Sequence, residues 1–379
     1  MKSVIKNANI VLPDCSGYEK TDVLIENGII SAIGSNLTAD KVVDARGKYL
    51  LPGFIDIHNH GALGMYFGSE DADYIKMLMF FAKNGVTTVI PTTGTNTVDV
   101  IVNQIKNIVS FKEKGVNKGA RIGGIHLEGP FISNEKKGAM AGQSPDCTVE
   151  NFNRFIKAGK GEIKIMTIAP ERENAIDVIK AGVKCGVCMS LGHTMATSDE
   201  AMAAINAGAN HATHTFNAMR SYNHREPGVL GAVLTAPSVD CEVICDMVHL
   251  NPITIEIIRR TKGLDKMILI SDAVPITGLP NGEYVVYDGQ VRIVKDGVSV
   301  TKTGTIAGSC FTMGDSTKKL VNNGYSIADI AKIGALNPAR AVGLENKLGT
   351  IEKGKYADML ICDENMNIEQ VILRGESLL

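Results

Sequence analysis

The chain has 379 residues, of which 44% are hydrophobic and 21% charged, and its formal net charge at pH 7 is −2. The apolar fraction suffices for a large core, and the nearly balanced charge excludes an electrostatic argument for nucleic-acid binding. Because residues 1–9 lack the features of a secretory signal and no apolar run is long enough to span a membrane, we expect a cytoplasmic protein without a membrane partner.

Both ends of the chain carry strand-like patterns. The strand-like segments are 3–11 and 22–34 near the beginning, and 354–363 and 368–375 near the end. The Asn27-Gly28 pair between two apolar runs predicts a two-residue hairpin. Because neither end is long enough to bury a core alone, we predict one small β-sandwich domain made from residues 1–52 together with 346–379.

Between these ends, short apolar strands alternate with amphipathic helical stretches, which is typical of repeated βα units and a parallel sheet. The eight expected strands are 54–58, 86–90, 121–126, 162–168, 187–191, 211–214, 241–245 and 267–271. The clearest helical stretches are 71–84, 97–112, 197–207 and 252–262. Eight strands with interleaved helices favour a (β/α)8, TIM-like barrel over residues 53–345, with an open doubly wound sheet as the alternative.

The chain beyond the eighth strand has a different pattern. Residues 282–297 alternate in short apolar and polar steps around glycines, which predicts an excursion rich in β-hairpins. Helical segments at 316–323 and 327–334 follow, and 337–340 opens a final short helix.

Polar residues capable of chemistry gather at the predicted carboxyl ends of the strands, where the active site of such a barrel lies. His58 and His60 end the first strand, and their spacing of two places both rings on one side of an extended chain. The other residues at or just after strand ends are Glu128, His193, His214, His249 and Asp272. A single histidine at a strand end is more often a hydrogen-bonded core residue, but five of the chain's eight histidines share this location.

The remaining three histidines receive other interpretations. His126 precedes Glu128 within the third strand, and His211 begins the sixth, so we expect both to support neighbouring site residues. His224 is expected in a loop.

Two histidine nitrogens and a carboxylate leave an open position on a tetrahedral divalent ion, which is the catalytic type of metal site. Zinc is the favoured ion, and iron, cobalt or manganese also suit these ligands. A metal ion lowers the pKa of the water bound to it. Asp272 is expected to take the proton of that water and carry it to the leaving amine. His249 is expected to polarise the carbonyl group under attack. The site therefore predicts metal-assisted hydrolysis of an amide.

The eight cysteines are scattered through apolar segments, which favours free thiols in a reducing compartment over a disulfide framework. They are Cys15, Cys147, Cys185, Cys188, Cys241, Cys245, Cys310 and Cys362. Cys185 and Cys188 have CxxC spacing, but no second pair accompanies them, so we favour structural thiols over a metal or redox role.

Several short motifs are distributed over essentially the whole chain. The more general ones are LPGFIDIHNHG from Leu51, HLEGPF from His126, GHT from Gly192, DMVH from Asp246, SDA from Ser271 and IAGS from Ile306. The more specific pair is THTFNAM from Thr213, followed by HREPG from His224. Together these motifs resemble those of the N-acetylglucosamine-6-phosphate deacetylases, a branch of the amidohydrolase superfamily.

The resemblance implies that Glu128, His193 and His214 hold the main metal ion, with Asp272 as the proton carrier. His58 and His60 would then build a second metal position that Glu128 bridges, so one or two ions are expected per subunit. The resemblance also implies a substrate-binding set of His249 at the acetyl group, Arg225 at the phosphate of a substrate in the partner subunit, and Ala139, Asn217, Ala218, Ile306, Ala307 and Gly308 around the sugar. An arginine acting in the partner's site implies that the active protein is a homodimer. The substrate that the resemblance implies places the reaction in amino-sugar catabolism.

One departure from the family pattern concerns the sugar. Many family members have a histidine where this chain has Met140, and a thioether cannot donate a hydrogen bond. Contacts there would come from Gln143, main chain or water, and N-acetylgalactosamine 6-phosphate is an alternative substrate.

Two other hypotheses remain. A cyclic-amide hydrolase or N-acyl amino acid hydrolase of the same superfamily is one, although cyclic-amide hydrolases typically place a carbamylated lysine at the end of the fourth strand, and Lys164 lies near its beginning. A non-catalytic scaffold is the other, but none of the expected ligands is missing.

Overall fold

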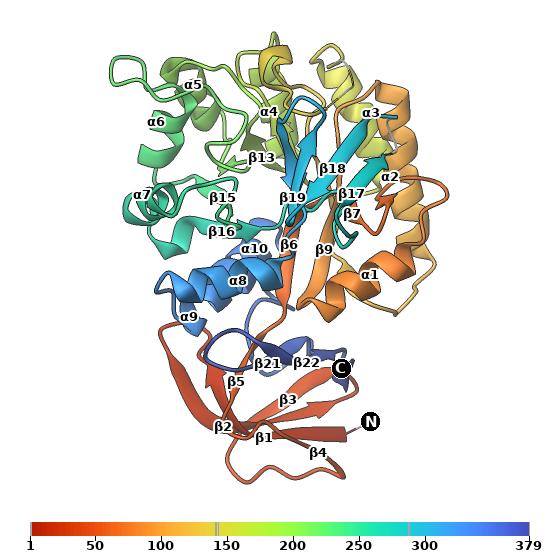
Figure 1. The fold of residues 1–379 in the computed structure, drawn as a ribbon, viewed down its shortest axis with the longest axis vertical. Helices are drawn as coiled ribbons and strands as arrows, with labels where there is room; N and C mark the ends of the chain where they lie inside the picture. The colour runs from red at the N-terminus through yellow and green to blue at the C-terminus, as the bar shows by residue number, and fades with distance from the viewer. Residues whose placement is uncertain (1, 141, 143, 287–288, 379) are drawn as a thin grey trace.

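The computed structural model describes residues 2–140, 142, 144–286 and 289–378. It shows a barrel surrounded by helices, with a strand-rich domain beside it that contains both ends of the described chain (Figure 1). Within the described residues, no helix is long and apolar enough to cross a membrane.

The β domain is built from both ends of the chain, as the sequence predicts. Its strands are β1 (Lys2–Val11), β2 (Tyr18–Glu26), β3 (Ile29–Gly34), β4 (Lys41–Asp44), β5 (Tyr49–Pro52), β21 (Met359–Cys362), β22 (Ile368–Leu373) and β23 (Glu376–Ser377). They form one sheet in the order β23-β22-β21-β5-β1-β2-β3, with β4 also paired to β1. The hairpin at Asn27 and Gly28 is confirmed, with φ values of 52° and 77° that match a two-residue turn.

The β domain has an apolar core of its own, whose buried side chains include Ile5, Val23, Leu50, Ile361 and Ile372. Strand β1 changes its pairing partner along one edge: residues 3–6 pair with β4 and residues 9–10 with β5. A bulge between Ile5 and Ala8 separates these two parts of β1. The exact limits of this domain, 1–52 with 346–379, and of the barrel domain, 53–345, stay a prediction.

The barrel has its strands in chain order, so the TIM-like fold is confirmed and the open sheet is wrong. The strands are β6 (Phe54–Asn59), β9 (Val86–Thr93), β10 (Arg121–Ile122) with β11 (Ile125–Leu127), β12 (Ile163–Ile168), β13 (Cys188–Leu191), β14 (His211–Ala212), β15 (Asp240–Ile244) and β16 (Met267–Ile270). Just beyond the last strand, the amide of Asp272 donates to His58 O at 3.0 Å and the amide of His60 to Ala273 O at 2.7 Å. These bonds join the last strand to the first.

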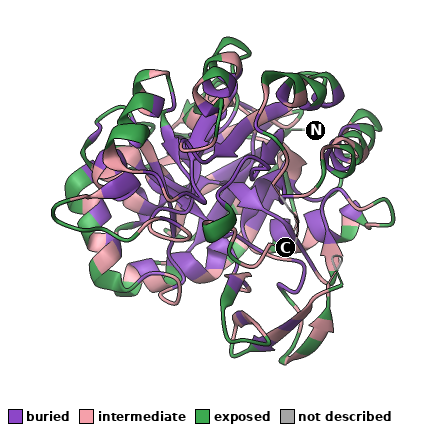
Figure 2. Cartoon of the chain, turned by 90° about the horizontal axis from the view of Figure 1, so that it is seen from above, coloured by how far each residue is buried: buried purple, intermediate pink, exposed green. Residues whose placement is uncertain are grey.

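Helices surround the barrel, with their buried faces towards the strands and their outer faces exposed (Figure 2). They are α1 (Tyr74–Lys83), α2 (Val98–Glu113), α3 (Val149–Gly159), α4 (Ala175–Lys184), α5 (Ser198–Asn206), α6 (Gly228–Thr235), α7 (Pro252–Lys262), α8 (Met313–Asn322), α9 (Ile327–Ala331) and α10 (Asn337–Ala341), with a π-helical turn at Lys332–Leu336. Local signals mark several starts, such as the Thr197–Glu200 capping box of α5 and Asn251 before Pro252 of α7.

A four-stranded antiparallel sheet follows the last barrel strand and lies against the barrel mouth (Figure 1). Its strands are β17 (Gly282–Val285), β18 (Val291–Lys295), β19 (Val298–Thr301) and β20 (Ile306–Ser309). The amide of Ser309 donates to Asp272 O at 2.9 Å, so the end of β20 is hydrogen-bonded to the segment just beyond the last barrel strand. The predicted hairpin excursion over 282–297 is thereby confirmed, and two further strands, β19 and β20, extend it.

All eight cysteines are free thiols. Cys15, Cys147, Cys241, Cys245 and Cys362 are buried, Cys188 and Cys310 are half-buried, and Cys185 is exposed.

Candidate active site

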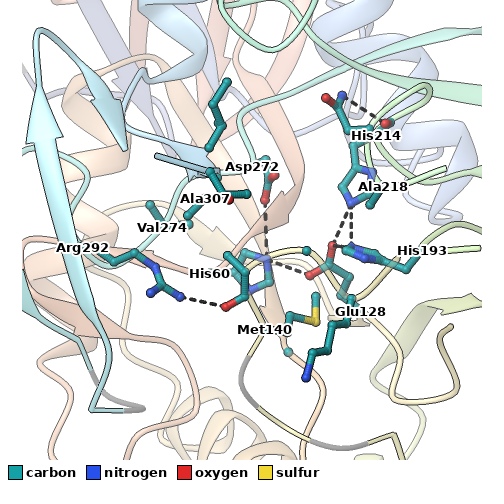
Figure 3. Close-up of a pocket in the computed structure, with 18 of the residues that line it drawn as sticks. His60, Glu128, Met140, His193, His214, Ala218, Asp272, Val274, Arg292 and Ala307 are labelled. Atoms are coloured by element: carbon teal, nitrogen blue, oxygen red, sulfur yellow. Dashed lines mark hydrogen bonds and ion pairs between the residues drawn. The ribbon is translucent and has the colours of Figure 1, made fainter. Parts of the chain in front are cut away.

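The seven polar residues predicted at strand ends all lie at one mouth of the barrel, and Figure 3 shows several of them facing a common point. They come from β6 and the segments that follow β6, β11, β13, β14, β15 and β16, as His58, His60, Glu128, His193, His214, His249 and Asp272. Since the carboxyl ends of parallel strands meet at one rim, this grouping follows from the fold.

Glu128 is at the centre of the group. Its Oε1 lies 2.9 Å from Nε2 of His193 and 3.0 Å from Nε2 of His214, and the two nitrogens are 2.9 Å apart. A tetrahedral zinc ion with bonds of about 2.0–2.1 Å holds its ligand atoms about 3.3 Å apart, which is close to this spacing. The three donor atoms therefore fit one divalent ion.

The proton on His193 supports the same conclusion. Its Nδ1 lies 2.6 Å from the carbonyl oxygen of Lys136, which can only accept, so Nδ1 carries a proton. This contact orients the ring so that Nε2 is the nitrogen that faces Glu128, which is how a histidine that binds a metal ion is typically held by a carbonyl group at its other nitrogen.

His58 and His60 approach Glu128 from the first strand. Nε2 of His58 lies 3.2 Å from Oε1 of Glu128, but without hydrogen-bond alignment, and it is buried with no hydrogen-bond partner among the described residues. Nε2 of His60 lies 3.1 Å from Oε2, and both rings lie 3.5 Å from Oδ1 of Asp272. The two carboxylate oxygens of Glu128 thus face two sets of histidines.

Glu242 is a site residue that sequence reasoning missed. Its buried carboxylate accepts hydrogen bonds from Nδ1 of His58 at 2.9 Å, Nε2 of His211 at 3.2 Å and the amide of His214 at 3.0 Å. Burial works to raise the pKa of Glu242, but His58 and His211 hold it well below its usual value. Its signal in the sequence is a lone acidic residue between apolar neighbours in a predicted barrel strand.

The two supporting histidines lie beneath the site, as predicted. His126 contacts Ile57 O at 2.9 Å and Thr167 Oγ1 at 3.0 Å through its two nitrogens, and burial lowers its pKa to about 3, so the ring is neutral. His211 contacts Glu242.

Asp272 is held in place at the seam of the barrel. Asp56 accepts from the hydroxyl of Ser271 at 2.5 Å and from its amide at 3.2 Å, which fixes the residue before Asp272 against the first strand. Asp272 itself adopts a left-handed φ of 50°. Burial works to raise the pKa of Asp272, but the charge of His58 and a hydrogen bond with His60 lower it, so the carboxyl group is ionised at neutral pH.

A cavity of about 380 Å³ opens above these residues. The predicted substrate-binding residues Ala139, Asn217, Ala218, His249, Ile306, Ala307 and Gly308 all line it. Its volume is in the range of small-molecule sites.

Arg225 is the exception. It is exposed on the turn between Asn223 and Glu226, and it is not among the described residues that line the cavity. Within one chain, Arg225 does not contribute to the pocket.

Arg292 and two lysines also line the cavity and were not predicted. Arg292, on β18, is buried, and its Nη2 donates to Ala139 O at 2.8 Å. Lys136 and Lys137 come from the same loop as Ala139. Glu135 lines the cavity beside them, so this part of the wall carries charges of both signs. The sequence alone did not connect Arg292 to the site, because β18 lies far along the chain from the loop that it contacts.

Met140 lines the cavity, whereas Gln143 lies outside the described residues. Lys164 is the second residue of β12, at the opposite end of the barrel from the site, and its ammonium group contacts Gly161 O at 3.5 Å. It is therefore not placed to bridge metal ions, which argues against the cyclic-amide hydrolase hypothesis.

Comparisons with known proteins agree with this geometry. The model of the amidohydrolase family matches residues 49–378. The chain is 33% identical to N-acetylglucosamine-6-phosphate deacetylase of Lysinibacillus sphaericus, over 97% of this chain and 96% of the relative. It is 30% identical to N-acetylgalactosamine-6-phosphate deacetylase of Escherichia coli O157:H7, over 93% of each.

Among solved structures, the chain is similar to a mutant N-acetyl-D-glucosamine-6-phosphate deacetylase from Mycobacterium smegmatis in complex with N-acetyl-D-glucosamine-6-phosphate. The TM-score is 0.90 at 30% identity, and the match covers 100% of this chain and 99% of that one.

Proposed function

The chain belongs to the amidohydrolase family and, within it, to the N-acetylglucosamine-6-phosphate deacetylases, and on this premise we propose how its residues perform the reaction. The enzyme hydrolyses the N-acetyl amide of N-acetylglucosamine 6-phosphate to glucosamine 6-phosphate and acetate. The observation that carries the assignment of roles is the convergence of Glu128, His193 and His214 beside Asp272 at the base of the cavity.

Glu128, His193 and His214 would hold a divalent metal ion, and zinc is our choice from the two nitrogen and one oxygen donors. When bound, the ion supplies Lewis-acid chemistry: it polarises the amide carbonyl and lowers the pKa of the attacking water towards about 7. His58 and His60 would offer a second position next to Glu128, and we expect one ion to be enough for turnover.

Asp272 moves the proton. Its ionised carboxylate accepts a proton from the attacking water and gives it to the amine nitrogen when the carbon–nitrogen bond breaks. His249, on the wall of the same cavity, donates a hydrogen bond to the acyl oxygen as negative charge develops there.

The loops at Ala139, Asn217 and Ala218 and the strand β20 orient the sugar. Ile306, Ala307 and Gly308 line the cavity from the added sheet, and because Ala307 and Gly308 are small, the substrate can reach peptide groups at this wall. Ordered peptide groups bind sugar hydroxyls without the entropy cost of fixing side chains.

Arg225 binds the 6-phosphate of a substrate in the partner subunit of a homodimer. Arg225 is exposed and is not among the described residues that line its own chain's cavity, which supports a role in another subunit, and a guanidinium group offers paired donors for phosphate oxygens. We further propose that the enzyme works in the cytoplasm, where phosphorylated amino sugars are consumed.

N-acetylgalactosamine 6-phosphate is a second candidate substrate. Met140 in the cavity wall supports it, since the thioether cannot donate to a sugar hydroxyl, and so does the similarity to a deacetylase of that sugar.

The test is acetate release from a panel of N-acetylated gluco- and galacto-sugars, each with and without the 6-phosphate. We expect release only from phosphorylated sugars, with the gluco epimer preferred. A preference for the galacto epimer would establish the second candidate, and no release from either phosphorylated sugar would refute both.

A further inference from the structure

Asp246 is a buried carboxylate next to the cavity that the roles above leave unused. It follows β15 at the carboxyl end of the barrel and is only 1% exposed. Oδ1 accepts from the amides of Val248 and His249, both at 2.9 Å. Oδ2 accepts from Nδ1 of His249 at 2.8 Å and from the hydroxyl of Ser309 at 3.0 Å.

These four donors keep Asp246 ionised. Burial works to raise the pKa of its carboxyl group, but the hydrogen bond from the His249 ring and those from the main chain lower it to about 2. An ionised carboxylate only accepts hydrogen bonds, so Nδ1 of His249 carries a proton.

The other nitrogen of His249 is the one available to substrate. The ring lines the cavity, and among the described residues Nε2 has no hydrogen-bond partner, whereas Nδ1 is committed to Asp246. For Nε2 to donate to an acyl oxygen it must also carry a proton, which requires the positively charged ring. A carboxylate at Nδ1 stabilises that charge and fixes the plane of the ring.

Asp246 also contacts strand β20, which contributes residues to the cavity wall. Ser309, which donates to Asp246, ends β20, and its amide donates to the carbonyl oxygen of Asp272 at 2.9 Å. One carboxylate therefore touches both the His249 ring and the strand whose residues Ile306, Ala307 and Gly308 line the cavity.

We propose that Asp246 is a positioning residue that acts through His249, holding the ring so that Nε2 presents a hydrogen to the acyl oxygen of the substrate. The inference rests on the deacetylase function proposed above and adds a residue to it. Asp246 touches neither substrate nor metal in this role.

The charges around His249 give the role a pH signature. Asp246 and, from the end of β16, Asp272 favour the charged ring. The ammonium group of Lys319 on α8 is also nearby and donates to Asp246 O at 2.7 Å. Burial works to lower the pKa of His249, but the two carboxylates raise it above its usual value. The charged ring, which is the hydrogen-bond donor, is present below the pKa of His249 and lost above it. Removing the charge of Asp246 lowers the pKa of His249 and therefore shifts the alkaline limb of activity to lower pH.

The experiment is a double-mutant cycle on the metal-loaded enzyme with N-acetylglucosamine 6-phosphate. We expect His249→Ala to lower kcat roughly 10²–10³-fold, the loss seen when one donor to a developing oxyanion is removed. Asp246→Asn should lower kcat by no more than that, leave KM nearly unchanged, and shift the alkaline limb of kcat/KM to lower pH. In the His249→Ala background, Asp246→Asn should cost nothing further.

Asp329→Asn is the matched control, because this carboxylate accepts the amide of Ser326 at the start of α9, outside the cavity, and should leave the profile unchanged. Asp246→Glu keeps the negative charge and replaces the asparagine variant in the experiment if that variant does not fold. The alkaline limb of kcat/KM in Asp246→Glu should stay at the wild-type position. Any decrease in kcat that it causes should disappear in the His249→Ala background.

Independent, additive losses at Asp246 and His249, or an unchanged alkaline limb in Asp246→Asn, would overturn the proposal. Both results presuppose a wild-type enzyme that releases acetate, so a wild type inactive on every phosphorylated sugar refutes the proposed function instead.

Discussion

Nδ1 of His58 lies 2.9 Å from Oε2 of Glu242, and through this contact a carboxylate on β15 fixes the orientation of a histidine on β6. The same oxygen accepts the amide of His214 at 3.0 Å. Because Nδ1 of His58 donates a hydrogen bond to Glu242, the ring is oriented so that its other nitrogen, Nε2, faces Glu128.

Glu242→Gln should therefore weaken metal binding without touching any ligand of the metal. The amide keeps the size of the side chain but loses the charge, and such supporting partners are typically worth about 10–100-fold in metal affinity or activity. A chelator competition titration measures the effect. Glu256→Gln, on an exposed face of α7 paired with Arg259 and Arg260, is the control, and equal affinities in the two variants would contradict the role.

Asp272→Asn should retain the metal ion and lose turnover. The amide cannot accept the proton of the attacking water, and loss of a general acid–base typically costs about 10²–10⁴-fold in rate. Metal content by elemental analysis and acetate release are measured on the same sample. Loss of the metal from this variant would mean that Asp272 is primarily a ligand.

The pair His58 and His60 should decide how many ions bind. Under metal excess we expect the wild type to approach two ions per chain and the double variant His58→Asn, His60→Asn to bind one, because Oε1 of Glu128 still faces His193 and His214. The single-ion variant should still release acetate. If the wild type also saturates at one ion, the pair is structural.

Arg225→Ala should lose the preference for the 6-phosphate. If the arginine acts in the partner's site, mixing Arg225→Ala with the inactive Asp272→Asn and allowing subunits to exchange restores one intact site in each heterodimer. Statistical mixing then gives about a quarter of wild-type activity. A mixture with no more activity than its components would show that Arg225 does not act across a dimer.

Much of the site was predictable because one rule places it. Once βα alternation indicates a barrel, the carboxyl ends of its strands must meet, so His58, Glu128 and Asp272 are brought together although 214 positions separate the first from the last. The period of two in an extended strand likewise predicted that His58 and His60 share a side.

The contacts that were missed depend on register between strands. Glu242 reaches His58 only because β15 and β6 bring their inward faces together across the barrel, and no local pattern encodes that distance. Arg292 reaches Ala139 only because the added sheet folds back over the mouth. The sequence patterns also did not predict helices over the residues that form α3, α4 and α6.

The most direct test of the account is acetate release from N-acetylglucosamine 6-phosphate by protein that is stripped of metal and then reloaded. We predict that the stripped protein is inactive, that one equivalent of a divalent ion restores activity, and that Glu128→Gln is not restored, because its amide disrupts the donor set shared with His193 and His214. Acetate release at the wild-type rate by metal-free protein, or by Glu128→Gln, would contradict the account.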